Sequence, residues 1–214
     1  MNRSRDKVRC ALNHQNAGSI PVDFGSTAVT GIHCRIVEAL RNYYGLAPRP
    51  VKIVDAFQML GEIDAELAEK IGVDCIGIGG PKDIFDLDTT RMHEQTTPWG
   101  QRVLVPEAMD LTPDMRGDVY VYAGGDQNYP PSAVMPKGCY FINAIERQQP
   151  IEEDLLDPED NVEEFGLLTE NDLAYYCAEA DKAYQTGRAV VASFGGTALG
   201  DVAFVPGMGL KQPK

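Results

Sequence analysis

The stretch from Ile20 to Thr27 has the sequence Ile-Pro-Val-Asp-Phe-Gly-Ser-Thr and leads into a helical pattern that begins near Thr30. Such an apolar run predicts a strand that brings a carboxylate, a glycine and two hydroxyls to the start of a helix. Free N–H groups at a helix start favour anionic ligand groups, and α/β enzymes gather their reacting groups at strand carboxyl ends. An alternative stays open, in which Ser26 or Thr30 only caps the helix and Asp23 only ends the strand.

The same order of elements recurs twice further along the chain. Asp55-Ala-Phe-Gln58 has the form of a capping box, and apolar residues follow at helical spacing until Gly72. Thr169-Glu-Asn-Asp172 likewise predicts a helix start, and Gly187 marks its end. A short apolar strand follows each helix, which indicates an α/β fold with a parallel sheet covered by helices. The strands expected to lie parallel and adjacent, in this order, are 20–23, 73–78 and 189–193.

Between about Arg91 and Gln149 the helical spacing gives way to short alternating or apolar runs. These runs are separated by Gly-Gly-Asp, Pro-Pro and Pro-Lys-Gly, which are typical turn sequences. The pattern predicts an antiparallel β meander inserted between two β/α units, and we expect it to form part of the roof over an active site. The predicted strands of the meander lie within 99–105, 118–122 and 139–142.

Length and composition are typical of a soluble α/β protein. The chain has 214 residues, of which 43% are hydrophobic and 24% charged, so it can bury a sizeable core within one domain. No apolar run is long enough to cross a bilayer, and Met1–Lys7 leads into an amphipathic helix rather than a secretory signal. The five cysteines are scattered and odd in number, which indicates reduced thiols in a cytoplasmic protein.

The net charge of −13 argues against nucleic-acid binding, because no basic cluster is dense enough to replace the counterions of a phosphate backbone. Acidic residues gather at 152–154 and 157–160, which we interpret as a solvated linker rather than a metal or partner site. An anionic small substrate would need arginines close to its binding site.

Five segments match one known family in order and spacing. They are the helix end Ala11-Leu-Asn-His14, the stretch Ile20–Gly25, the helix start Thr30-Gly-Ile-His33, the segment Gly72-Val-Asp-Cys-Ile-Gly77, and Ser193-Phe-Gly-Gly-Thr-Ala-Leu-Gly-Asp201. Together they resemble the uroporphyrinogen decarboxylase family, in particular its bacterial branch of decarboxylase-like and corrinoid-methyltransferase-like proteins. The resemblance extends over essentially the whole chain.

The resemblance implies a partial TIM (β/α)8 barrel with the β meander inserted at about 91–149. Family members are barrels of about twice this length, so residues 1–214 are expected to be the N-terminal portion of a single barrel domain. Such a portion leaves an unpaired parallel edge beside residues 189–193. An open edge of that kind favours association with another chain, including self-association.

The family contains at least two chemistries. Its decarboxylases carry an Arg-Gln-Ala-Gly-Arg segment after the first strand, and an aspartate just after the second. Here the corresponding places are Phe24-Gly-Ser-Thr27 and Ile78-Gly-Gly-Pro81, with only Asp83 nearby. A tetrapyrrole rich in carboxylates needs several cationic donors, so the missing arginines favour the methyltransferase members.

The methyltransferase members bind zinc, mostly through residues of their C-terminal half, while a separate corrinoid protein docks at the barrel mouth. This chain has no His-X-Cys and no Cys-X-X-Cys, and the adjacent His33 and Cys34 diverge on a helix. We therefore expect no zinc site wholly within these residues, and structural roles rather than zinc ligation for His14, His33 and His93. No cofactor is expected within this chain, while zinc and a corrinoid are expected of the full-length parent.

The resemblance implies an enzyme that moves a methyl group between a small donor or thiol and a corrinoid protein. Uroporphyrinogen decarboxylation in porphyrin biosynthesis, with altered carboxylate contacts, and a non-catalytic fragment both stay open. The 214-residue chain alone is expected to be inactive. The residues expected to bind the small-molecule substrate are Asp23, Ser26, Thr27, His33, Ser193 and Thr197.

Thr197 belongs to the glycine-rich segment 194–201, which follows the third predicted strand. Its glycines would let the backbone approach a phosphate or a corrinoid tail, and a simple tight turn explains the sequence equally well. The spacing matches neither a dinucleotide fingerprint nor a P-loop. We therefore expect no nucleotide site there.

Overall fold

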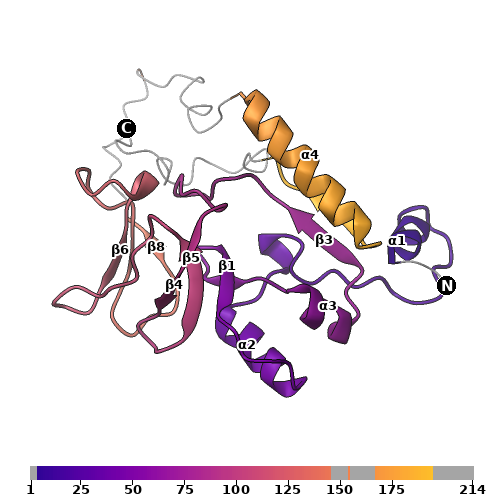
Figure 1. Cartoon of the computed structure of the whole chain (residues 1–214), viewed down its shortest axis with the longest axis horizontal. Helices are drawn as coiled ribbons and strands as arrows, with labels where there is room; N and C mark the ends of the chain where they lie inside the picture. The colour runs from indigo at the N-terminus through magenta and orange to yellow at the C-terminus, as the bar shows by residue number, and fades with distance from the viewer. Residues whose placement is uncertain (1–3, 146–153, 155–166, 195–214) are drawn as a thin grey trace. The chain divides into compact units, whose positions relative to one another are not determined.

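The computed structural model of the chain describes residues 4–145, 154 and 167–194 (Figure 1). The described residues form a mixed α/β structure without a closed barrel. They divide into two compact units. The first unit contains residues 4–51, 60–80 and 168–194, and the second contains residues 52–59 and 81–145.

The first unit is built around a pair of parallel strands. Strand β3 (Cys75–Ile78) pairs with β9 (Ala189–Ala192), with Cys75 opposite Ala189. Helix α4 (Glu170–Gln185) precedes β9 and packs along both strands, and α1 (Ser4–Leu12) also contacts both (Figure 1). The predicted parallel pairing of the second and third strands is therefore confirmed. The other elements of this unit are η1 (Ala28–Thr30), α2 (Cys34–Tyr43), β2 (Leu60–Gly61) and α3 (Ala65–Ile71).

The prediction of a strand at residues 20–23 is wrong. The segment is extended and lies beside the residue that precedes β3: the N–H of Asp74 donates to the Val22 carbonyl at 2.7 Å, and the Val22 N–H donates to Asp74 Oδ2 at 2.9 Å. Pro21 has no N–H to donate to a strand ladder, and the side chain of Ile20 is 85% exposed. The segment therefore contacts the start of β3 without extending the sheet.

Two helices begin later than the sequence pattern predicts. Helix α2 starts after His33, because the short 3-10 turn η1 occupies residues 28–30. The side chain of Asp64 caps α3 by accepting the N–H groups of Glu66 and Leu67, so the predicted capping box at Asp55 is wrong. Asp55 ends a strand instead and stabilises the turn that follows.

The predicted boundaries of α4 and the end of α3 agree with the structure. Thr169 and Asp172 form the capping box of α4, with reciprocal side-chain and backbone hydrogen bonds. Gly72 ends α3 in the left-handed conformation with φ 81°, and Gly187 follows α4 with φ 76°. These helix ends can be predicted from the sequence, because capping involves only residues that are neighbours along the chain.

The second unit contains strands of two sheets. In one sheet β5 (Arg102–Pro106) lies between β1 (Val51–Asp55) and β4 (Met92–Thr96), and the β4–β5 pairing is antiparallel (Figure 1). The other sheet has the order β6-β7-β8 with antiparallel pairs. Its strands are β6 (Val119–Val121), β7 (Ala133–Met135) and β8 (Asn143–Ala144), and the 3-10 turn η2 (Ala123–Gly125) follows β6.

The predicted antiparallel character of the insertion is confirmed over the residues that the structure describes, up to residue 145. Three details differ from the prediction. The strands form two sheets rather than one meander, β4, β7 and β8 were not foreseen, and residues 139–142 are not a strand. Cys139 lies instead in the turn closed by its N–H to the Pro136 carbonyl at 2.9 Å.

Each unit has its own apolar core. In the first unit β3 and β9 themselves are only half-buried, apart from the exposed Ala192, which is unusual for parallel strands. Among the described residues, no helix has both the length and the apolar character required to span a membrane. The main core side chains are Cys34, Val37, Leu67 and Tyr176 in the first unit, and Phe85, Leu87, Val103, Val105, Leu111 and Met135 in the second.

Candidate functional site

The loop after the extended segment is a closed turn built by Asp23 and Ser26. Ser26 donates its hydroxyl hydrogen to Asp23 Oδ2 at 2.7 Å and its backbone N–H to Asp23 Oδ1 at 3.3 Å. Gly25 bends the chain with φ 86°, and its N–H donates to the Thr30 carbonyl at 2.9 Å. The predicted candidates Asp23 and Ser26 are therefore in direct contact.

This turn lies directly on β3, at Gly77. A Cβ atom added to Gly77 would be 1.8 Å from the Ser26 carbonyl oxygen, so only glycine fits there. Gly77 pairs with Val191 in the carboxyl-terminal half of β3. The Asp23–Ser26 turn is thereby positioned beside the carboxyl end of the parallel pair.

Ser193 lies at the same end of the pair. Its N–H donates to the Ile78 carbonyl at 2.9 Å, which continues the β3–β9 register by one residue. The Tyr176 hydroxyl of α4 donates to the Ser193 carbonyl at 2.9 Å, and the Tyr176 ring lies 5.0 Å from that of Phe194. Helix α4 therefore fixes the backbone that follows β9.

Thr27 and His33 have structural roles in the described residues. The Thr27 N–H donates to Thr30 Oγ1 at 3.4 Å within the η1 turn. His33 caps α2, because its Nδ1 accepts the Arg35 N–H at 3.2 Å. The last predicted candidate, Thr197, lies outside the described residues.

At the opposite, amino end of β3, the charged groups beside the extended segment are Asp74 and Lys7. Burial raises the pKa of the Cys75 thiol on β3, and the charges of Asp23 and Asp74 raise it further. Burial also acts to raise the pKa of Asp74, but hydrogen bonds from Lys7 and the Val22 N–H hold it below its ordinary value. Lys7 Nζ lies 2.5 Å from Asp74 Oδ2, so that carboxylate is neutralised by its own partner. The loop Asp23–Thr27 itself contains no lysine or arginine.

The described residues do not fit the zinc ion that the resemblance implies for the full-length parent. No group of three His, Cys, Asp or Glu side chains that could hold a metal ion occurs in the part of the chain that the structure describes. His33 Nδ1 is engaged in helix capping, and burial raises the pKa of the neighbouring Cys34 thiol to about 12. A thiol so far from ionisation is a poor metal ligand.

Sequence reasoning did not single out Gly77 or Tyr176, although one signal was present for each. A glycine inside the strand Cys-Ile-Gly-Ile indicates a close backbone approach, and that approach comes from Ser26. Tyr176 stands among apolar residues at helical spacing, a pattern that by itself predicts only a core position. A buried tyrosine hydroxyl usually has a hydrogen-bond partner, which here is the backbone after β9.

The Asp23–Ser26 pair offers carboxylate oxygens and one hydroxyl but no positive charge. It is suited to hydrogen-bond donors such as hydroxyl, amine or thiol groups, whereas an anionic group would be repelled unless cations came from other residues. In comparisons with known proteins, the chain matches no family model, no curated protein and no solved structure.

Proposed function

We propose that this chain forms the first β/α units of a barrel of the uroporphyrinogen decarboxylase type, and that the enzyme moves a methyl group between a small donor or thiol and a corrinoid protein. The parallel pairing of β3 with β9 supports the barrel part of the proposal. Parallel neighbours need a crossover, and α4 packs on both of these strands. The incomplete burial of β3 and β9 agrees with a sheet that continues.

The seating of the Asp23–Ser26 turn on Gly77 is the observation that carries the choice of chemistry. By the family resemblance, this turn corresponds to the place where the decarboxylases carry their arginine-containing segment. It brings a carboxylate to the carboxyl end of the strands, where a carboxylate-rich tetrapyrrole would need cations. The site therefore favours a small donor or thiol over a porphyrinogen.

In this proposal the turn borders the substrate pocket. Asp23 accepts a hydrogen bond from a hydroxyl, amine or thiol of the substrate, and the Ser26 hydroxyl orients that carboxylate. Ser193 lies at the same strand end and would border the other side of the pocket. The corrinoid is held by a separate protein that docks at this end, and self-association through the outer edge of β9 is part of the proposal.

Two assays on the protein expressed from its complete gene test the proposal. In the first, methylcobalamin replaces the methylated corrinoid protein, thiols are supplied as acceptors, and loss of the methyl group is followed by absorbance. In the second, uroporphyrinogen is supplied and coproporphyrinogen is measured. We expect demethylation in the first assay and no product in the second. Efficient formation of coproporphyrinogen, or no methyl transfer with any thiol or methoxylated donor, would overturn the proposal.

Variants of the turn connect the activity to this site. Asp23→Asn and Ser26→Ala should each lower kcat/KM for methyl transfer by about tenfold or more, as expected for the loss of a charge-assisted hydrogen bond. Asp110→Asn is the matched control, because Asp110 is an exposed carboxylate that caps a similar turn through the Thr112 N–H in the second unit. Equal losses in all three variants would argue against the assigned site.

A further inference from the structure

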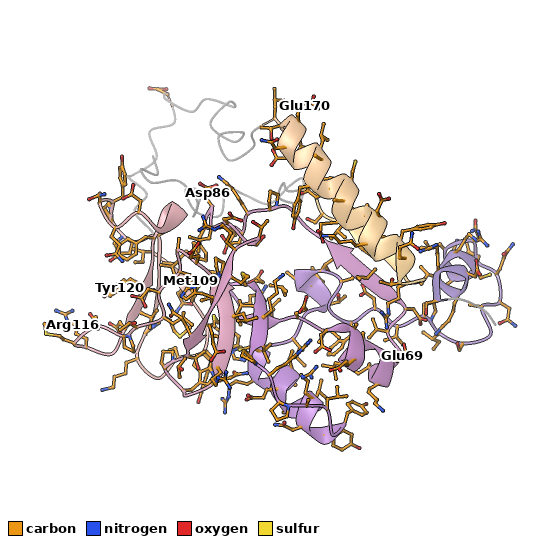
Figure 2. All side chains as sticks on the ribbon, in the orientation of Figure 1. Glu69, Asp86, Met109, Arg116, Tyr120 and Glu170 are labelled. Atoms are coloured by element: carbon orange, nitrogen blue, oxygen red, sulfur yellow. The ribbon has the colours of Figure 1, made fainter. Side chains whose placement is uncertain are left out.

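The turn at residues 83–87 in the second unit is tightly closed. The Asp83 N–H donates to the Leu87 carbonyl at 3.0 Å, and the Asp86 N–H donates to the Asp83 carbonyl at 3.0 Å. Asp86, labelled in Figure 2, takes the left-handed conformation with φ 59°. Phe85 and Leu87 are fully buried, and the Gly124 N–H donates to the Phe85 carbonyl at 2.8 Å. The turn is therefore anchored in the core of the second unit.

The Asp83 carboxylate is only half satisfied. Its Oδ1 accepts the N–H groups of Phe85 and Leu87, both at 2.9 Å. Its Oδ2 is buried without a hydrogen-bond partner among the described residues. A carboxylate charge in this position is costly, because water cannot reach that oxygen and no donor replaces the water.

The charged groups around Asp83 do not offset that cost. Asp55, at the end of β1, is close enough for its charge to act on Asp83, and its own carboxylate accepts the Gln58 N–H at 2.7 Å. Asp86 adds a second negative charge, although Lys82 Nζ lies 2.6 Å from its carboxylate. The turn η2, which contacts the Phe85 carbonyl, consists of Ala-Gly-Gly and carries no charge, and its flanking titratable residues are Tyr122 and Asp126.

These surroundings raise the pKa of the two half-buried carboxyls, Asp83 and Asp55. Burial, helped by the charges of Asp55 and Asp86, raises the pKa of Asp83 to about 6, although the two backbone hydrogen bonds act to lower it. Burial also raises the pKa of Asp55. Asp83 thus changes its charge near neutral pH inside a turn that is closed by its own carboxylate.

We propose that the 83–87 turn is a pH-sensitive element, which is closed while Asp83 carries a proton and loosens when that proton is lost to solvent. Loosening lets water reach Oδ2 and moves the charge away from Asp55. A carboxyl whose pKa is raised in the closed turn stabilises it fully below its ordinary value, and the stabilisation is lost as the pH rises through about 6. This inference does not depend on the proposed methyl transfer.

The first test follows the Asp83 carboxyl carbon by NMR during a pH titration of the whole chain. We expect a midpoint near pH 6. In Asp55→Asn the midpoint should fall, because one neighbouring negative charge is removed. A midpoint near 4, the ordinary value for an aspartate, would overturn the proposal.

The second test measures amide hydrogen exchange at Gly124, whose N–H donates to the Phe85 carbonyl. After correction for intrinsic exchange, the opening constant should rise about tenfold between pH 5 and pH 7.5, as linkage requires for a carboxyl displaced to about 6 from its ordinary range. Amides paired between β4 and β5 should show no such change. If the opening constant at Gly124 does not change between pH 5 and pH 7.5, the inference is wrong.

Matched variants assign the effect to Asp83. Asp83→Asn should remove the pH dependence at Gly124. Asp88→Asn should retain it, because Asp88 is exposed in the same loop, and hydrogen bonds from the Thr90 hydroxyl and N–H hold the pKa of its carboxyl low. If the pH dependence persists in Asp83→Asn, the inference is wrong. If that variant does not fold, the titration of the unaltered chain decides alone.

Discussion

The Ser26 carbonyl oxygen lies so close to Gly77 that a Cβ atom there would be only 1.8 Å from it. Gly77→Ala should therefore displace the Asp23–Ser26 turn or distort β3, and it should lower the free energy of unfolding by about 1–3 kcal/mol or more. Urea unfolding measures the effect. The matched control is Gly79→Ala, because nothing lies within 4 Å of a Cβ at Gly79. A loss at Gly79 as large as that at Gly77 would show that the close approach to Ser26 is not the cause.

Elements with strong local signals could be predicted from the sequence. The start of α4 follows from Thr169 and Asp172, whose side chains satisfy backbone groups within the same turn. The end of α3 follows from Gly72, whose left-handed backbone few other residues tolerate. The pairing of β3 with β9 required only the repeated order of helix, glycine and apolar strand.

The elements that were missed depend on contacts distant in sequence. Asp55 and Asp64 both have side chains suited to helix capping, but Met59 has a left-handed backbone with φ 52° and Leu60–Gly61 form β2, so the helix begins only after Asp64. A local capping pattern at Asp55 cannot reveal this strand, whose Gly61 N–H donates to the distant Ile32 carbonyl. At residues 20–23 the apolar character predicted a strand, whereas the missing N–H of Pro21 leaves few groups for a ladder.

The candidate site was predictable in part for the same reason. The contact between Asp23 and Ser26 spans three residues, so their sequence proximity brings them together. The seating of their turn on Gly77 and the bond from Tyr176 to the Ser193 carbonyl join segments far apart in the chain. The spacing of residues along the sequence does not predict which distant segments make those contacts.

Substitution of Asp64 should destabilise the first unit more than substitution of most of its other polar residues. It caps α3 and pairs with Arg41, whose side chain is 3% exposed, and with Arg49 at 2.8 Å. Asp64→Ala leaves the Arg41 charge buried with fewer partners, so the free energy of unfolding should fall by about 3–5 kcal/mol. Glu66→Ala is the control: Glu66 also contacts Arg41 but its side chain is 59% exposed, so the loss should stay near 1 kcal/mol or less. Urea unfolding of both variants distinguishes these values.

The same carboxylate should contribute to acid sensitivity. Burial acts to raise the pKa of Asp64, but hydrogen bonds from the Leu67 N–H and Arg41, with the charges of Arg49 and Arg41, hold it below its ordinary value. A lowered pKa means that its stabilisation is present above the unfolded value near 4 and is lost as the pH falls further. Asp64→Asn should therefore flatten the fall in stability below about pH 4. If the free energy of unfolding falls equally steeply with pH in Asp64→Asn, other carboxyls determine the acid sensitivity.

Helix α1 should depend on Arg5 for its attachment. This helix has no buried residue, but Arg5 Nη2 donates to the Tyr184 carbonyl at 2.6 Å and its guanidinium lies 3.7 Å from the centre of the Tyr184 ring. In Arg5→Ala, α1 should detach more often, so proteases should cleave it at least several-fold faster than in the unaltered chain. Arg9→Ala is the control within the same helix, because in the described part of the chain the Arg9 guanidinium pairs only with Asp6 on the surface. Equal cleavage of the two variants would contradict the assigned role of Arg5.

The thiols should react with an alkylating reagent in an order set by burial and charge. Cys139 and Cys177 are exposed and should be modified first. Cys75 is half-buried, and burial together with Asp23 and Asp74 raises its pKa, so it should react more slowly. Cys34 is fully buried, and burial raises its pKa to about 12, so it should react only when the first unit opens. Peptide mass spectrometry after timed iodoacetamide treatment at pH 8 gives the order. Early modification of Cys34 would show that its site is open in solution.

Asp23→Asn supplies a sharper comparison for Cys75. Removing the Asp23 charge should speed the reaction of Cys75 while leaving the rate at Cys139 unchanged.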